Sequence, residues 1–192
     1  MKQKIKQIAS VQVGYSFRSR IEPGKEGPIS VIQMKDLENS FVNTNEFIKT
    51  DISDVKETYL IRKNDIIFRA RGVTNTSAIL KEEVGEGVVA APLFRIRVTA
   101  ENVLPDYVCW YINLPQSQKY LSSHAKGTAQ KMIPRETLED FEIEVPSLDC
   151  QQGVIEIAQL QQKELNLLQD LASKRKHFID LILIKSVKET SS

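Results

Sequence analysis

Three stretches of the chain carry basic side chains and no acidic ones, and these side chains could bind an anion. The stretches are residues 1–21, 66–81 and 107–135. Lysine and arginine neutralise phosphates, and arginine can also form paired hydrogen bonds with base edges. The acidic residues gather elsewhere, so a net charge of +1 is compatible with a head that has one positive face. The alternative is that these gaps reflect the ordinary scatter of surface charge.

The chain lacks the residue patterns of the common catalytic and metal sites. Its two histidines, His124 and His177, have no cysteine or carboxylate at ligand spacing, which argues against zinc. No glycine-rich phosphate loop occurs. The paired carboxylates Glu82 and Glu83 lie in a charged turn that offers no burial, which is a poor setting for acid–base catalysis. The sequence therefore predicts no metal, no cofactor and no catalytic residue.

Two predicted strands, at residues 66–71 and 88–98, each contain two arginines that alternate with apolar residues. The arginines are Arg69 and Arg71 in the first strand and Arg95 and Arg97 in the second. Because successive side chains point to opposite faces, the arginines of each strand share one face. In the first strand Phe68 and Ala70 share the other face. An arginine-bearing face could bind nucleic acid, or it could be a solvated sheet face, which is the commoner case.

The other elements predicted for this part of the chain are short. Helices are expected to begin at Pro105, at Pro115 and near Pro134, and the second is expected to end near Gly127. Further elements are a helix or strand at 5–13, strands at 29–34 and 141–146, a turn at 62–65 and loops at 39–45 and 126–131.

A single long helix is predicted from about residue 146 to 187, since this stretch has one glycine and no proline after Pro146. Apolar residues recur along it at steps of three and four, with Gln161 and Arg175 as polar interruptions. The apolar stripe comprises Val154, Ala158, Leu165, Leu168, Ala172, Ile179 and Ile182. A flanking apolar row makes the stripe wider than a solvated helix needs. At roughly 55 Å, the helix would also be too long to bury this face against its own head alone.

We therefore expect a head of mixed α+β and α/β structure at residues 1–146 and a long helix at residues 147–192. No apolar run is long enough to span a membrane, and the first residues lack the apolar region of a signal peptide. The two cysteines, Cys109 and Cys150, form no paired motif, which suits a reducing cytoplasm. Each cysteine is expected to be a small buried side chain and not a nucleophile.

Four stretches, in their order and spacing, resemble the specificity (S) subunits of type I restriction-modification systems. They are residues 11–17, residues 61–72 with their arginine-glycine end, the Gly-Thr-Ala-Gln loop within 127–133, and the junction at 141–152. The junction, which leads through Pro146 to Gln151 and the helix, is the most specific of the four. The family's glycine-aspartate turn is replaced here by Asn64-Asp65. Since asparagine tolerates positive φ, we expect that turn to survive.

The resemblance implies a target recognition domain followed by a spacer helix. Complete members of the family contain two of each, and their helices pack antiparallel and set the distance between the two domains. Modification (M) subunits supply the methyl-transfer chemistry. This chain has a single copy of each part and is similar to half of such a subunit. The implied partners are double-stranded DNA, a second copy of the chain in an antiparallel dimer, M subunits and, as a further candidate, restriction (R) subunits. Such a dimer would read a symmetric, split target.

On this interpretation the chain binds DNA without catalysis, through cations on phosphates and a few polar side chains on base edges. The expected DNA-binding residues are Arg18, Arg20, Arg69, Arg71, Thr74, Asn75, Lys126, Thr128, Gln130 and Lys131. The expected dimer interface comprises Val154, Gln161, Leu165, Leu168, Ala172, Arg175, Ile179 and Ile182, in which Gln161 and Arg175 would fix the register. Arg95 and Arg97 are left out, because a sheet face that points away from DNA explains them equally well.

Two other functions are compatible with the sequence. The chain could be an interaction module, such as a decoy S fragment, that binds M subunits without reading DNA. An enzyme with an unrecognised site is the more distant alternative.

Overall fold

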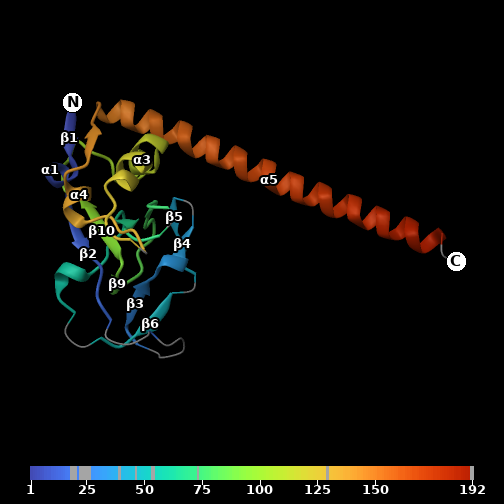
Figure 1. The fold of residues 1–192 in the computed structure, drawn as a ribbon, viewed down its shortest axis with the longest axis horizontal. Helices are drawn as coiled ribbons and strands as arrows, with labels where there is room; N and C mark the ends of the chain where they lie inside the picture. Colours follow the sequence, from blue (N-terminus) through green and yellow to red (C-terminus); the bar gives the residue numbers. More distant parts are fainter. Residues whose placement is uncertain are drawn as a thin grey trace. The chain divides into compact units, whose positions relative to one another are not determined.

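A computed structural model describes residues 1–17, 21, 27–38, 40–45, 47–52, 55–72, 74–128 and 130–190. The chain divides into two compact units, Met1–Gln152, which we call the head, and the residues from Gly153 onward. The described strands and the helices α1 to α4 belong to the head, and the second unit is the greater part of one long helix, α5 (Leu148–Thr190) (Figure 1). A mixed α/β head followed by a long helix is therefore confirmed.

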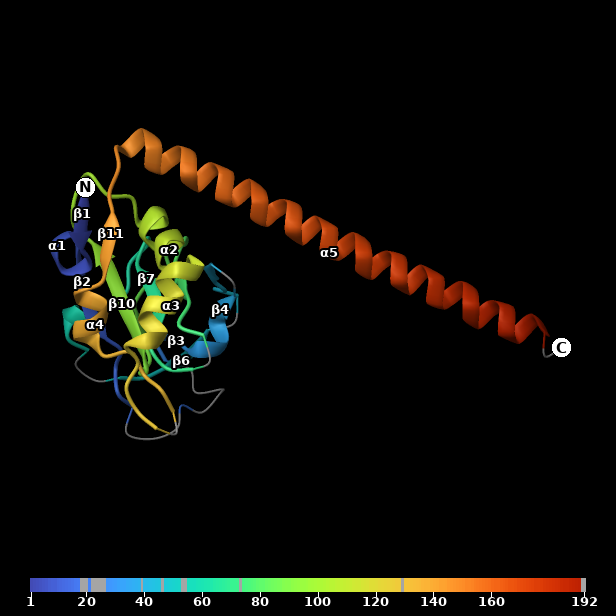
Figure 2. The ribbon, with the colours of Figure 1, turned by 45° about the horizontal axis from the view of Figure 1, so that its top comes forward.

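The head is built on a six-stranded sheet with the order β2-β10-β7-β8-β5-β4. Its strands are β2 (Ala9–Val13), β10 (Leu93–Val98), β7 (Ile66–Arg69), β8 (Ser77–Ile79), β5 (Phe41–Val42) and β4 (Leu37–Glu38). Neighbouring strands are antiparallel except β5 and β8. The two arginine-bearing strands, β7 and β10, are therefore neighbours (Figure 2). In their register Arg95 lies opposite Ile67 and Arg69 opposite Leu93.

Two smaller sheets complete the head. The first has the order β6-β3-β9 and consists of β6 (Ile48–Thr50), β3 (Ile29–Ile32) and β9 (Gly87–Val89). The second pairs β1 (Lys2–Lys4) with β11 (Glu142–Glu144), so that Lys2 lies opposite Glu144 and Lys4 opposite Glu142. Opposite charges at facing positions stabilise such a pair of strands.

Four short helices, α1 (Ile5–Ile8), α2 (Pro105–Asn113), α3 (Pro115–Ser123) and α4 (Arg135–Glu139), contribute to one hydrophobic core with the large sheet. In that core Phe68 and Phe94 of the sheet pack with Ile112 of α2. The opposite face of the sheet packs Ile67 and Leu93 against Ile32 of the small sheet. Both faces of the central strands are therefore buried in hydrophobic cores. Each fully buried side chain of this size stabilises the fold by about 1.5–3 kcal/mol.

Several local predictions are confirmed by the backbone. Pro105 and Pro115 are the first residues of α2 and α3, where the missing N–H of proline has no helical partner to lose. Asn64 has a φ of 68°, so the turn before β7 survives with asparagine in place of glycine. Phe68 and Ala70 point into the first core, as their alternation predicts.

Other local predictions were wrong in detail. The helix from Pro115 ends at Ser123, earlier than Gly127. The prediction for residues 5–13 left the choice between helix and strand open, and both are present, as α1 and β2. Residues 39–45 were predicted as a polar loop but contain β5, because the backbone of Phe41 pairs with that of Ile79. That pairing is a long-range contact, which the local pattern of residues 39–45 does not reveal.

Gln151 ties the junction before α5 to the rest of the head. Its side chain is fully buried and accepts a hydrogen bond from the amide of Leu104 at 2.9 Å. It donates to the carbonyls of Asn102 and Pro146, both at 2.9 Å. A buried amide with all of these partners fixes the backbone on either side, so the segment that leads into α5 is anchored within the head.

The helix α5 is continuous over 43 residues and spans about 65 Å at 1.5 Å per residue. The single long helix is thus confirmed. Many of its large apolar side chains are exposed in the single chain: Ile157, Leu160, Leu165, Leu167, Leu168, Leu171, Phe178, Ile179, Leu181, Ile182, Leu183, Ile184 and Val187. Of the predicted interface, Val154 is half-buried, and Gln161, Ala172 and Arg175 are exposed. Among the described residues, no helix has the length and apolar character to cross a bilayer.

Candidate nucleic-acid interface

Two loops that are far apart in the sequence, residues 70–76 and 126–132, lie side by side beyond the end of β7. The backbone of Met132 pairs with Arg71 and also with Lys126. The amide of Lys126 donates to the carbonyl of Met132 at 2.8 Å and the amide of Met132 donates back at 2.9 Å. Paired strands lie about 5 Å apart, so the backbones of Arg71 and Lys126 lie within about 10 Å of each other. We call these two segments the paired loops; in Figure 2 the described part of the second one extends below α3 and α4.

The 126–132 loop depends on a glycine for its shape. Gly127 has a φ of 109°, a conformation that L side chains rarely adopt. A Cβ atom at this position would also lie 2.8 Å from the carbonyl oxygen of Gln130. The turn is therefore tight, and it presents the neighbouring side chains from a closely folded backbone.

Six of the predicted DNA-binding residues lie on the paired loops with exposed side chains. They are Arg71, Thr74, Lys126, Thr128, Gln130 and Lys131. Within the described part of the chain, none of these side chains forms a hydrogen bond or an ion pair. Three cations and three uncharged polar groups are thus free for other partners. Phosphate oxygens suit the cations, and the edges of bases suit the hydroxyl and amide groups.

Asn75 occupies a different place from the one predicted. It is only 6% exposed, and its side-chain amide donates to the carbonyls of Arg69 at 3.0 Å and Ala70 at 3.3 Å. This placement gives Asn75 a structural role within the 70–76 loop in place of the DNA-contacting role that the sequence suggested, because its amide is already bonded and is shielded from solvent.

Arg69 is half-buried and connects the 70–76 loop to a turn from another part of the head. Its guanidinium donates to the carbonyl of Met34 at 3.0 Å. Its Nε is buried and has no hydrogen-bond partner among the described residues. The aliphatic part of the Arg69 side chain lies close to Gly72: a Cβ atom added to this glycine would be 3.6 Å from Cδ of Arg69. Arg69 is therefore less available to DNA than Arg71, although the two are only two residues apart.

Amide side chains of two helices hold the 70–76 loop from the other side. Gln118 of α3 donates to the carbonyls of Asn75 and Ile112, both at 2.8 Å. Asn113 of α2 accepts from the amide of Ser77 at 2.8 Å and donates to its carbonyl at 2.8 Å. Neither supporting residue is predicted from the sequence. Their one signal is an amide side chain on a predicted helix, which is too common to identify a partner 36 or 43 residues away.

The two cysteines differ from each other. Cys109 of α2 is buried, and its carbonyl accepts a hydrogen bond from the hydroxyl of Ser77 at 3.1 Å. Burial raises the pKa of the Cys109 thiol to about 12, so it stays protonated near neutral pH and is a poor nucleophile. Its predicted burial is confirmed, whereas the same prediction was wrong for Cys150, which is exposed.

The basic residues near the N-terminus do not form an unopposed positive surface. Lys4 and Lys6 contact the carboxylate of Asp140 at 3.1 Å and 2.8 Å. Hydrogen bonds from Lys6 and then Lys4 hold the pKa of Asp140 below its ordinary value. Arg18 and Arg20 lie outside the described residues, so their DNA-binding role stays a prediction. In the described head, the free cations predicted to bind DNA lie on the paired loops.

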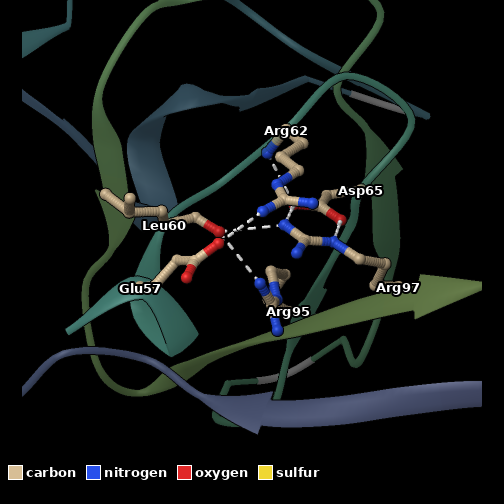
Figure 3. A network of polar contacts seen from close by, with 6 residues as sticks. All are labelled: Glu57, Leu60, Arg62, Asp65, Arg95 and Arg97. Carbon is tan, nitrogen blue, oxygen red and sulfur yellow. Dashed lines mark hydrogen bonds and ion pairs between the residues drawn. The ribbon is translucent and has the colours of Figure 1, made fainter.

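Arg95 and Arg97 belong to an internal network at the opposite end of β7 from the paired loops (Figure 3). The guanidinium of Arg97 donates to both carboxylate oxygens of Asp65 at 2.7 Å and to the carbonyl of Leu60 at 2.9 Å. Arg95 donates to the same carbonyl at 2.9 Å. Asp65 is 1% exposed and Arg95 is 6% exposed. Burial is the main cause that lowers the pKa of Arg95. The arginines on this face of β10 are therefore held by partners within the head, with Arg95 buried and Arg97 half-buried.

Comparison with known proteins gives a consistent family likeness. Residues 1–175 match the family described as type I restriction modification DNA specificity domain. Over 140 residues the chain is 24% identical to the specificity subunit of the type I restriction enzyme EcoBI from Escherichia coli. That alignment covers 70% of this chain and 29% of the relative, so the chain matches less than a third of the relative's length.

Solved structures share the fold at low sequence identity. The HsdS subunit from Thermoanaerobacter tengcongensis is 11% identical, with a TM-score of 0.59 over 88% of this chain and 38% of that one. The type I restriction-modification S subunit from M. genitalium is 13% identical, with a TM-score of 0.60 over 89% and 41%. A chain from a structure of type I system complex assembly is 13% identical, with a TM-score of 0.65 over 91% and 41%.

Proposed function

Because the chain belongs to the type I restriction-modification DNA specificity family, we propose that its head binds a specific double-stranded DNA sequence and directs modification subunits to it. In this proposal the chain contributes recognition and no catalysis. The chemistry of methyl transfer, and of cleavage where a restriction subunit takes part, resides in the partner subunits.

The observation that supports this function best is the set of six exposed side chains on the paired loops. Arg71, Lys126 and Lys131 would neutralise phosphates or bind guanine edges, and Thr74, Thr128 and Gln130 would bind base edges. A folded domain usually pairs part of its surface charge, as Lys4 and Lys6 are paired here. Two loops held side by side with all six groups free are suited to DNA, which offers phosphates to the cations and base edges to the uncharged polar groups.

We further propose that two copies of the chain associate through α5. The apolar stripe of this helix is exposed in the single chain, and its spacing is that of a helix that packs against another helix. An antiparallel pair would place one head at each end of the dimer and would give the complex a twofold axis. The DNA target would then consist of two equivalent half-sites separated by a fixed spacing.

A selection experiment tests the DNA-binding proposal. The full chain, assembled with its modification subunit, is mixed with a pool of random duplexes, and the bound duplexes are sequenced. We expect enrichment of one split, symmetric motif and an affinity that falls steeply with salt. Equal binding of all sequences would contradict the specificity role. Tight association with the modification subunit without DNA binding would support the interaction-module alternative.

The mass of the chain in solution tests the dimer. We expect a dimer for the unmodified chain and a monomer for the variant Leu168→Glu with Ile179→Glu, which places two charges in the apolar stripe. The matched control is Lys163→Glu with Lys174→Glu, which has the same spacing on the far side of the helix and should stay dimeric. A monomeric unmodified chain at micromolar concentration would overturn the proposal.

A further inference from the structure

The paired loops have a third neighbour, the turn η1 (Met34–Asp36), which follows β3. The guanidinium of Arg69, the last residue of β7 before the 70–76 loop, donates to the carbonyl of Met34 at 3.0 Å. Arg71 and Thr74 are exposed on that same loop. The turn is therefore next to the candidate interface, although it precedes the loop by more than thirty residues.

The backbone of this turn is held on both sides. The buried carboxylate of Asp36 accepts from the amide of Gln33 at 2.8 Å, and the amide of Asp36 donates back to the carbonyl of Gln33 at 3.1 Å. The carbonyl of Asp36 accepts from the amide of Asn43 at 2.8 Å. With Arg69 bound to the carbonyl of Met34, the turn presents its side chains from a fixed position.

The two residues presented by the turn differ in character. Met34 is apolar and 36% exposed, and Lys35 is an exposed cation whose Nζ lies 3.5 Å from the carboxylate of Asp36. Met34 is thus an exposed apolar side chain with two cations close to it, Lys35 next in the chain and Arg69 bound to its carbonyl. It is a good match for the major groove, where the C5-methyl group of thymine is an apolar contact bordered by phosphates. The flexible thioether of methionine adapts to such a contact.

We propose that η1 is a third DNA-contacting segment, in which Met34 reads the C5-methyl group of a thymine and Lys35 contacts a neighbouring phosphate. This inference rests on the proposed function and extends it to a specificity-determining residue. It adds to the six side chains of the paired loops the one apolar contact that base recognition in the major groove commonly uses.

The test replaces each thymine of the selected target by uracil, one position at a time, because uracil lacks only the C5-methyl group. For the unmodified chain with its modification subunit, we expect one replacement to weaken binding about three- to tenfold. For Met34→Gln we expect weaker binding to the thymine duplex and no further loss on that replacement. Met34→Leu, which keeps an apolar side chain, should retain the sensitivity to uracil.

The matched control is Leu148→Gln, which removes a similarly exposed apolar side chain, 43% exposed, from the first turn of α5. It should retain the full sensitivity to uracil. The inference is overturned if Met34→Gln stays as sensitive as the unmodified chain, or if the unmodified chain selects a motif but tolerates every uracil. A failure of the unmodified chain to select any motif would instead overturn the proposed function on which the inference rests.

Discussion

The two arginine pairs of the head have the same sequence pattern, but the surroundings of Arg71 are opposite to those of Arg95 and Arg97. Arg69 is the last residue of β7 and Arg71 lies just beyond it, whereas Arg95 and Arg97 lie on the neighbouring strand β10. Because the strands are antiparallel, the pairs lie toward opposite ends of the sheet. At one end Arg97 clasps the buried Asp65, with Arg95 beside it (Figure 3). At the other end Arg71 is exposed and has no partner among the described residues.

This difference shows that an arginine on alternate positions of a strand is not by itself a sign of nucleic-acid binding. In the network at Asp65, the guanidinium of Arg97 is bound to the carboxylate of Asp65 and holds the turn at residues 62–65 against the sheet. It is therefore not available to DNA. On the paired loops, by contrast, the guanidinium of Arg71 is free among the described residues. Substitutions at the first end should change the stability of the head, and substitutions at the second should change its affinity for DNA.

The largest effect is expected at the internal end. Asp65→Ala leaves Arg97 without its carboxylate and removes the acceptor of the Arg62 amide, so we expect the free energy of unfolding to fall by about 3–5 kcal/mol. Urea denaturation measures this change. The control is Arg62→Ala, since its ion pair with Glu57 lies on the surface and contributes at most about 1 kcal/mol. If both variants lost the same free energy of unfolding, the buried network at Asp65 would not stabilise the head more than a surface ion pair does.

A smaller effect of a different kind is expected at the open end. Arg71→Ala should weaken binding to the selected DNA target by about 1–3 kcal/mol, because it removes a free guanidinium at the interface. Its free energy of unfolding should change by less than about 0.5 kcal/mol. Titration of the duplex and urea denaturation of the same sample separate the two quantities. If Arg71→Ala lowered the stability of the head and left DNA affinity unchanged, Arg71 would have a structural role and not the DNA-binding role proposed for it.

Asn75→Ala should lower the stability of the head and loosen the 70–76 loop, since the side chain of Asn75 holds this loop from inside the head. Loss of its two hydrogen bonds should lower the free energy of unfolding by about 1–2 kcal/mol. Amide hydrogen exchange in residues 70–76 should also become faster. Thr74→Ala is the control, because Thr74 is an exposed neighbour without a described partner, and it should leave exchange unchanged. If amide hydrogen exchange in residues 70–76 were unchanged in Asn75→Ala, Asn75 would not support this loop.

The smallest effect is expected for the loop lysines. Lys126→Ala with Lys131→Ala should weaken binding to all duplexes alike and reduce the slope of log affinity against log salt by about one per lysine that contacts phosphate. The variant Lys4→Ala with Lys6→Ala removes the same charge from a site neutralised by Asp140, and should leave the slope nearly unchanged. Equal slopes for both variants would mean that net charge, and not the paired loops, governs binding.

The sequence was sufficient for the elements whose signal is local. Proline at the first position of α2 and α3, asparagine at a left-handed turn and the three-four spacing of α5 each depend on a few neighbouring residues. The family likeness belongs to the same class, because it rests on short stretches in a fixed order. The exposed residues of the 126–132 loop could also be selected in this way, since glycine and lysine mark an exposed turn.

Only the tertiary structure decided which of the selected residues are free. Asn75 and Thr74 are adjacent and both polar, yet one is bonded inside the head and the other is exposed. Arg97 is held by Asp65, 32 residues away in the sequence, and Lys6 by Asp140. These partners are brought together by strand order and register, which depend on the packing of the whole core. A local pattern specifies the face of a strand, but the chemistry left available on that face depends on what folds against it.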